Sequence, residues 1–155
     1  MIGVASLGAT IETPIPVPEL DGITEFSLGS LGTCFLSGRS LSCMGANISD
    51  SLGDTTIPQF GEGVNVFDEL PGVLQVARGS YSGCALLGDG TAHCWGSNPR
   101  AQLGRTNPLQ SSSPLAVGGV PKFKTLLAGS QFYCAVTDDS SNEELWCWGA
   151  NTYGQ

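Results

Sequence analysis

The sequence predicts an all-β fold built from about three repeats of roughly 50 residues. Glycine and proline are frequent, with 22 and 9 among the 155 residues, which is typical of a chain with many turns. Short apolar runs at 73–77, 84–87 and 123–127 are bounded by turn residues, as β-strands are. We expect no amphipathic helix of useful length, because no stretch shows the helical period.

The repeat is defined by elements that recur in phase along the chain. A Gly-Ser pair and a cysteine each recur every 50 residues, at Gly29, Gly79 and Gly129 and at Cys34, Cys84 and Cys134. A Leu-Gly pair recurs once in each unit, at 7–8, 52–53 and 103–104, and its first copy is Leu7 and Gly8. We therefore expect four segments: a half repeat plus the first hairpin at 1–45, repeat units at 46–96 and 97–149, and the start of a further repeat at 150–155.

The six cysteines form one pair for each predicted hairpin: Cys34 and Cys43, Cys84 and Cys94, and Cys134 and Cys147. Loops at 38–39 and 88–90 place the first two pairs directly opposite across their hairpins, and 138–144 makes a longer loop in the third. Opposed Cβ atoms are about 4.5–5.5 Å apart, which is close to disulfide range. We predict one disulfide per repeat, and hence a secreted, extracellular or cell-surface protein.

Composition and spacing argue against several functions. The net charge is −8 with only 6 Lys+Arg, which disfavours binding to nucleic acid or to an anionic membrane surface. The sequence contains no run of 18 apolar residues, so it predicts no membrane span. The cysteine gaps of 8, 9 and 12 residues do not fit a zinc motif, and the one histidine, His93, has no visible catalytic partner. We expect a non-enzymatic protein with no catalytic site, no metal site and no cofactor.

Five motifs of the second repeat resemble the regulator of chromosome condensation repeat. They are A-x-G at 77–79, C-A-L at 84–86, D-G at 89–90, W-G-x-N at 95–98 and Q-L-G at 102–104. The third repeat is similar as far as Gln155. The first repeat departs from the pattern, because Met44 stands where the others have Trp95 and Trp148.

This resemblance implies a β-propeller, usually of seven blades, in which each blade is a four-stranded antiparallel sheet. The paired cysteines are similar to those of the secreted, disulfide-bearing members of the family. Three repeats cannot close a seven-bladed ring, and propellers protect their strand edges by closure. We therefore expect further repeats of a parent chain, or further copies of this chain, to complete the ring. No signal peptide is visible, so a mature or internal segment of a longer precursor is expected.

Residues that recur in the repeat are expected to be structural, and residues that vary are candidates for function. Trp95 and Trp148 recur as packing residues would. The loops between the Gly-Ser pair and the next cysteine vary, and we expect a partner-binding surface there, with packing between blades as the alternative. The candidate residues are Leu31, Tyr81, Phe132 and Tyr133.

Two further features have alternative interpretations. Asn47 begins the only N-x-S/T sequon, which predicts a glycosylation site, but it is also the Asn of the recurring Gly-x-Asn element. The acidic loop 138–144 lacks the spacing of a calcium loop and is expected to be a solvated tip.

The leading hypothesis for function is an extracellular, disulfide-stapled propeller segment that contacts protein partners, as a scaffold domain of a larger surface or filament protein. The alternative is an inhibitor or regulator of a specific enzyme or small GTPase, which the resemblance implies because relatives of both kinds exist. A third and weaker hypothesis is a hydrolase or lyase site in the propeller channel. Fold alone does not separate these functions.

Overall fold

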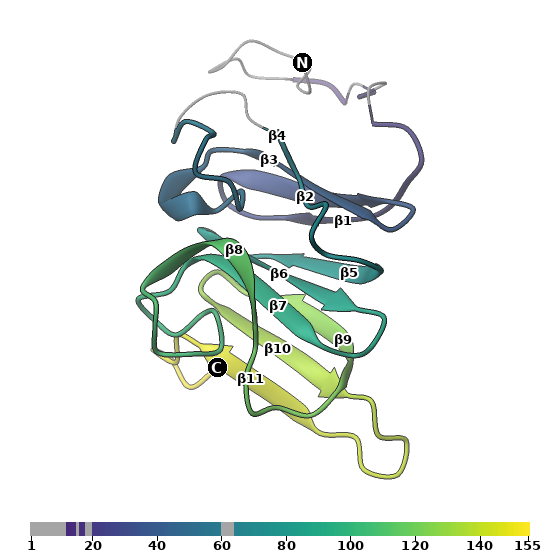
Figure 1. Cartoon of the computed structure of the whole chain (residues 1–155), viewed down its shortest axis with the longest axis vertical. Helices are drawn as coiled ribbons and strands as arrows, with labels where there is room; N and C mark the ends of the chain where they lie inside the picture. The colour runs from purple at the N-terminus through teal and green to yellow at the C-terminus, as the bar shows by residue number, and fades with distance from the viewer. Residues whose placement is uncertain (1–11, 15, 18–19, 60–63) are drawn as a thin grey trace.

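The structure is a computed structural model that describes residues 12–14, 16–17, 20–59 and 64–155. This part of the chain is all-β, with eleven strands in three antiparallel sheets and one 3₁₀ helix, η1 (Ile48–Asp50). The sheets are stacked along the long axis of the molecule (Figure 1). The predicted half repeat at the N-terminus, including Leu7 and Gly8, lies mostly outside the described residues.

In every sheet the strands follow one another in chain order. The first sheet contains β1 (Ile23–Leu28), β2 (Gly32–Ser37), β3 (Ser40–Gly45) and β4 (Val64–Val66). The second contains β5 (Val73–Arg78), β6 (Ser82–Leu87), β7 (Ala92–Ser97) and β8 (Gln110–Ala116), and the third contains β9 (Phe123–Ala128), β10 (Phe132–Thr137) and β11 (Leu145–Gly149). These sheets are propeller blades, as expected, and they make up part of a propeller.

The central hairpin of each sheet has the register expected from its loop length. Cys34 lies opposite Cys43, Cys84 opposite Cys94 and Cys134 opposite Cys147. Each pair forms a disulfide, with Cα atoms 4.0, 4.0 and 4.1 Å apart respectively. A non-hydrogen-bonded antiparallel pair brings the two Cα atoms this close together. The prediction of one disulfide per hairpin is therefore confirmed.

The sheets and the sequence repeat units have different phases. The unit boundaries expected at 45/46 and 96/97 fall at or next to the ends of β3 and β7. Each of these is the third of the four strands in its sheet. The fourth strand of each complete sheet therefore belongs to the following sequence unit. In the described chain, the connections between sheets lie at 67–72 and 117–122.

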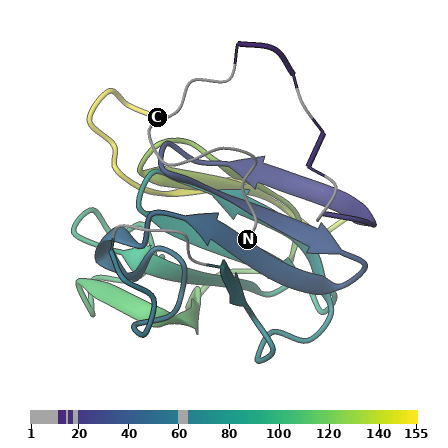
Figure 2. The same cartoon turned by 90° about the horizontal axis from the view of Figure 1, so that it is seen from above.

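The core lies between the sheets and is divided into two layers. One apolar cluster joins the first and second sheets, and it includes Leu36, Val76 and Trp95. A second cluster joins the second and third sheets, and it includes Leu86 and Leu126. Viewed along the stack, the blades overlap (Figure 2), which is the arrangement that these two clusters require.

Polar side chains on the first strand of one sheet bond to the backbone of the next. The carboxylate of Glu25 accepts a hydrogen bond from the Val76 amide at 2.8 Å. Fifty residues later, the Gln75 side chain accepts one from the Leu126 amide at 2.7 Å. The repeat therefore fixes the offset between neighbouring sheets as well as the hairpin inside each sheet.

Candidate functional site

Three turns of the repeat lie side by side at one end of the sheets. They comprise residues 29–31, 79–81 and 129–131, and together we call them the turn row. The Oγ atom of Ser80 lies 2.9 Å from that of Ser30 and 2.8 Å from that of Ser130. The Ser80 amide also donates to the Ser130 carbonyl oxygen at 2.8 Å. Because the serines bond to one another, the turns of three separate sheets form one continuous surface.

Two of the predicted partner-binding residues, Leu31 and Tyr81, project from the turn row. Their exposed fractions are 38% and 36%. Their backbone is fixed, since the Leu31 carbonyl oxygen accepts from the Ala46 amide at 2.8 Å and the Tyr81 carbonyl oxygen accepts from the Ser97 amide at 2.9 Å. Gly96 makes this approach possible, because a Cβ atom there would lie 2.5 Å from the Tyr81 carbonyl oxygen. The turn row thus presents an apolar and an aromatic side chain on a rigid base.

Tyr133 does not belong to this surface. It is fully buried, its hydroxyl oxygen lies 2.8 Å from Ser82 Oγ, and its ring stacks on Trp148 with centroids 6.0 Å apart. Burial raises the pKa of Tyr133 to about 12. In this chain Tyr133 therefore has the alternative role, packing between blades. The prediction of a partner contact is corrected, because the register of β10 turns this side chain toward the second sheet.

Phe132 lies on the other face of β10 from Tyr133. It is half-buried and lines a cavity of about 110 Å³ together with Trp148 and Asn151. Neighbouring residues of a strand point to opposite faces, so Phe132 is directed away from the second sheet. Its role as a partner contact stays a prediction, and its ring lies against Gly129 of the turn row.

Asn47 is held inside its own loop. Its side chain is buried, and Nδ2 donates to the carbonyl oxygens of Asp54 and Ile57 at 2.7 and 2.8 Å. Its Oδ1 accepts from the Leu52 amide at 2.9 Å. The folded loop has no room for a glycan on Nδ2, so the glycosylation prediction is corrected in favour of the structural role. The sequon cannot reveal this, since it specifies only local sequence.

The same asparagine geometry recurs in the second sheet. Asn98 Nδ2 donates to the Arg105 and Pro108 carbonyl oxygens at 2.9 and 2.6 Å, and Asn98 Oδ1 accepts from the Leu103 amide at 2.9 Å. The recurring Asn closes the loop after the third strand through its own side chain.

Arg78 is a buried charged residue that the sequence motifs do not single out. It is 2% exposed, and its guanidinium donates to the Ser51 carbonyl oxygen and, at 3.1 Å, to Ser51 Oγ. Burial lowers the pKa of Arg78 to about 10. Trp95 Nε1 donates to the same carbonyl oxygen at 3.1 Å. Two long side chains of the second sheet therefore hold the loop of the first, which makes Arg78 a structural group.

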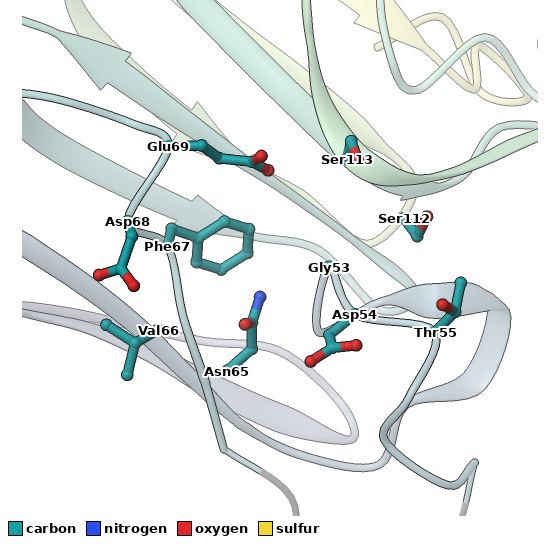
Figure 3. A pocket seen from close by; sticks show the side chains of 10 residues that line it. All are labelled: Gly53, Asp54, Thr55, Asn65, Val66, Phe67, Asp68, Glu69, Ser112 and Ser113. Carbon is teal, nitrogen blue, oxygen red and sulfur yellow. The ribbon is translucent and has the colours of Figure 1, made fainter.

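A second cavity lies at the outer rim, between β4 and residues 112–113 of β8. Its volume is about 340 Å³, and it is lined by three acidic residues, Asp54, Asp68 and Glu69. Figure 3 shows that Glu69 extends toward Ser113 while Asp68 is directed away, so the carboxylates do not converge on one point. A hydrogen bond from the Thr56 amide lowers the pKa of Asp54. Within the described residues, no group of three or more His, Cys, Asp or Glu could hold a metal ion.

The repeat geometry agrees with a comparison against protein families. Residues 73–102 and 128–155 match the model of the Regulator of chromosome condensation (RCC1) repeat. The predicted resemblance is thus confirmed, and the two RCC1 matches contain the 79–81 and 129–131 turns of the turn row.

Solved structures of propeller proteins are similar to this chain. Human WBSCR16 superposes with a TM-score of 0.70 and 19% identity, over 84% of this chain and 34% of that one. Yeast RCC1 (Prp20), solved with Kap60, has a TM-score of 0.69 and 19% identity, over 84% of this chain and 32% of that one. The ectodomain of the Physcomitrella patens receptor kinase CR4 has a TM-score of 0.54 and 22% identity, over 92% of this chain and 34% of that one. At these identities the likeness establishes the fold, and the chain spans about a third of each neighbour.

No helix within the described residues has the length and apolar character needed to cross a membrane.

Proposed function

We propose that this chain is part of a non-enzymatic, extracellular protein-interaction or scaffold module that contacts its partner through the turn row. The observation that carries the proposal is the exposure of Leu31 and Tyr81 on a backbone that neighbouring loops hold in place. Aromatic and apolar anchors on a rigid base are typical of energetically important contacts, because little side-chain or loop entropy is lost on binding. These are also positions at which the sequence repeats of this chain differ from one another.

The chemistry of the cysteines supports the extracellular part of the proposal. All six cysteines are in disulfides, which persist in oxidising compartments. One structural neighbour is the ectodomain of a receptor kinase, and another was solved in complex with a protein, Kap60. Intact mass of the protein from its native source, before and after reduction, tests the compartment. Six thiols that are already free in the native protein would contradict it.

Capture of partners from the native extracellular fraction tests the surface. The double variant Leu31→Ala/Tyr81→Ala is expected to lose at least about tenfold in recovery of a partner, since two hot-spot contacts are commonly worth over 1 kcal/mol each. Leu74→Ala is the matched control, because Leu74 is 50% exposed and lies in β5, outside the turn row. Equal recovery by the double variant and the wild type would overturn the proposal.

The alternative function is an inhibitor or regulator of an enzyme or small GTPase through loops on the propeller face. It is supported by the RCC1 repeat itself, because the family includes regulators of this kind. The same capture experiment separates the two functions. A single soluble enzyme or GTPase as the recovered partner would favour the regulator, and components of a surface or filament assembly would favour the scaffold.

A further inference from the structure

The hairpin of the third sheet encloses a cavity at the end of the strands opposite the turn row. In Figure 1 this hairpin loop, between β10 and β11, projects beyond the sheet in yellow. The cavity has a volume of about 260 Å³ and lies between this loop and the segment before β9. We call it the tip pocket, and its lining includes Lys122, Thr137, Asp138, Asp139, Glu144 and Trp146. The two other hairpins have shorter loops, at 38–39 and 88–90.

Hydrogen bonds inside the loop hold the tip pocket in shape. The Thr137 amide donates to the Glu144 carbonyl oxygen at 3.0 Å, and the Glu144 amide donates to Thr137 Oγ1 at 2.9 Å. Asp139 accepts from the Ser141 amide and hydroxyl at 2.9 and 2.7 Å. The Asp138 amide donates to the Lys122 carbonyl oxygen at 2.8 Å, which joins the loop to the opposite wall. A ligand would therefore meet a preformed site and lose little loop entropy on binding.

Trp146 supplies an aromatic wall with a fixed orientation. Its side chain is 37% exposed, and the residues in the equivalent positions of the other sheets are the smaller Ser42 and His93. Trp146 Nε1 donates to Glu144 Oε2 at 3.0 Å, and Asn142 Nδ2 donates to Glu144 Oε1 at 3.0 Å. The hydrogen bond to Glu144 involves Nε1 at the edge of the indole, while part of the ring remains accessible from the pocket.

The pocket also carries unbalanced negative charge. Lys124 pairs with Glu143, and Lys122, the one basic residue of the lining, has its Nζ 3.7 Å from Asp89 Oδ2. Within the described residues, Asp138, Asp139 and Glu144 therefore have no basic partner. The whole chain has a net charge of −8, which adds to the attraction for a cation.

We propose that the tip pocket binds one basic side chain, a lysine or an arginine, of a protein partner. The face of an indole attracts ammonium and guanidinium groups, and nearby carboxylates complete the site for the positive charge. The volume favours a single side chain, since pockets for whole small-molecule ligands span about 300–1,000 Å³. This surface is separate from the turn row, so the proposal can fail or succeed independently of the function proposed above.

Indole N–H signals in the NMR spectrum provide the test, because the chain has three tryptophans. The probes are acetyl-Gly-Lys-Gly-amide and acetyl-Gly-Arg-Gly-amide, and the matched control is the norleucine peptide, which has no charge. Trp146→Phe identifies the signal of Trp146. We expect the two basic peptides to shift the Trp146 signal and leave those of Trp95 and Trp148 in place, with weaker binding at higher salt.

Charge variants then separate the pocket from the general acidity of the chain. Asp138→Asn/Asp139→Asn is expected to weaken peptide binding about fivefold, since it removes two carboxylates of the site. Asp68→Asn/Glu69→Gln removes the same charge at the rim cavity and is expected to change the affinity less than about twofold. An equal shift with the norleucine peptide, no shift of Trp146 with any peptide, or the same loss in both double variants would overturn the proposal. Circular dichroism confirms that each variant is folded.

Discussion

The second and third sheets have the same cross-strand disulfide in the same register, yet its exposure differs. Cys84 and Cys94 are fully buried, since the third sheet packs over them in the second apolar cluster. In the third sheet, Cys147 is exposed and Cys134 is half-buried. The hairpin sequence alone therefore does not protect its disulfide. Protection comes from the sheet that follows.

Apolar residues on the same faces show the same contrast. Ala77 and Ala92 of the second sheet are 2% and 1% exposed beneath the third sheet. The residues that occupy these repeat positions in the third sheet are Leu127 and Leu145, which are larger and are 63% and 69% exposed. An apolar face of this kind is one that another blade would cover, in keeping with propeller closure.

The two recurring tryptophans lie on the opposite faces, which pack against the preceding sheet, and they also differ in burial. Trp95 is fully buried between two sheets and lies 4.5 Å from the Phe67 ring, whereas Trp148 is half-buried. Trp95→Ala is expected to lower the free energy of unfolding by about 3–5 kcal/mol. Trp148→Ala should cost about half as much, because less apolar area is lost. Urea denaturation followed by circular dichroism measures both values. Equal losses would contradict the proposed difference between the two interfaces.

Gly83 tests how closely the buried Trp95 ring packs against the neighbouring strand β6. A Cβ atom at this position would lie 2.5 Å from Trp95 Cζ2, so Gly83→Ala is expected to destabilise the chain by about 1–3 kcal/mol. The equivalent position in the third sheet holds Tyr133, whose ring stacks on Trp148 instead. Gly118→Ala is the matched control, since nothing lies within 4 Å of its added Cβ, and it should change stability by less than about 0.5 kcal/mol. A neutral Gly83→Ala would contradict the close packing of Trp95 on β6.

Tyr133 gives a smaller effect with a distinctive pH dependence. Tyr133→Phe removes the hydrogen bond with Ser82 Oγ and should cost about 1 kcal/mol at neutral pH. Burial raises the pKa of Tyr133 to about 12, above the value of about 10 for an unfolded tyrosine. Between these values the folded state keeps a proton that the unfolded state has lost, so stability falls as pH rises from about 10 to about 12. Tyr133→Phe should lose less stability over this range than the wild type, and an identical pH profile would contradict the burial of the hydroxyl.

The strands, hairpin registers and disulfides could be predicted because they depend on local signals. Loop length determines which residues face each other, as the opposition of Cys84 and Cys94 illustrates. Tyr133 and Asn47 could not be placed in this way, since their burial depends on groups from other strands and loops. Arg78 is a case in which the usual preference of arginine for solvent is misleading, because a loop of the neighbouring sheet supplies its acceptors.

The tip pocket is also beyond prediction from the sequence. The sequence shows the acidic residues of 138–144, but by themselves these residues indicate only a solvated tip. The pocket depends on contact between this loop and the segment at 121–122, which precedes β9. Sequence spacing does not reveal that Trp146 forms one of its walls.

Partial reduction tests the central claim, that each disulfide is protected by the sheet that follows it. The 155-residue chain by itself is treated briefly with a mild thiol reductant, alkylated, and analysed by peptide mass spectrometry, since thiol–disulfide exchange depends on access to the sulfur atoms. We predict that Cys134 and Cys147 are alkylated first, while the other four cysteines react only when the chain unfolds. Alkylation of Cys84 and Cys94 at the same rate as Cys134 and Cys147 would contradict the account.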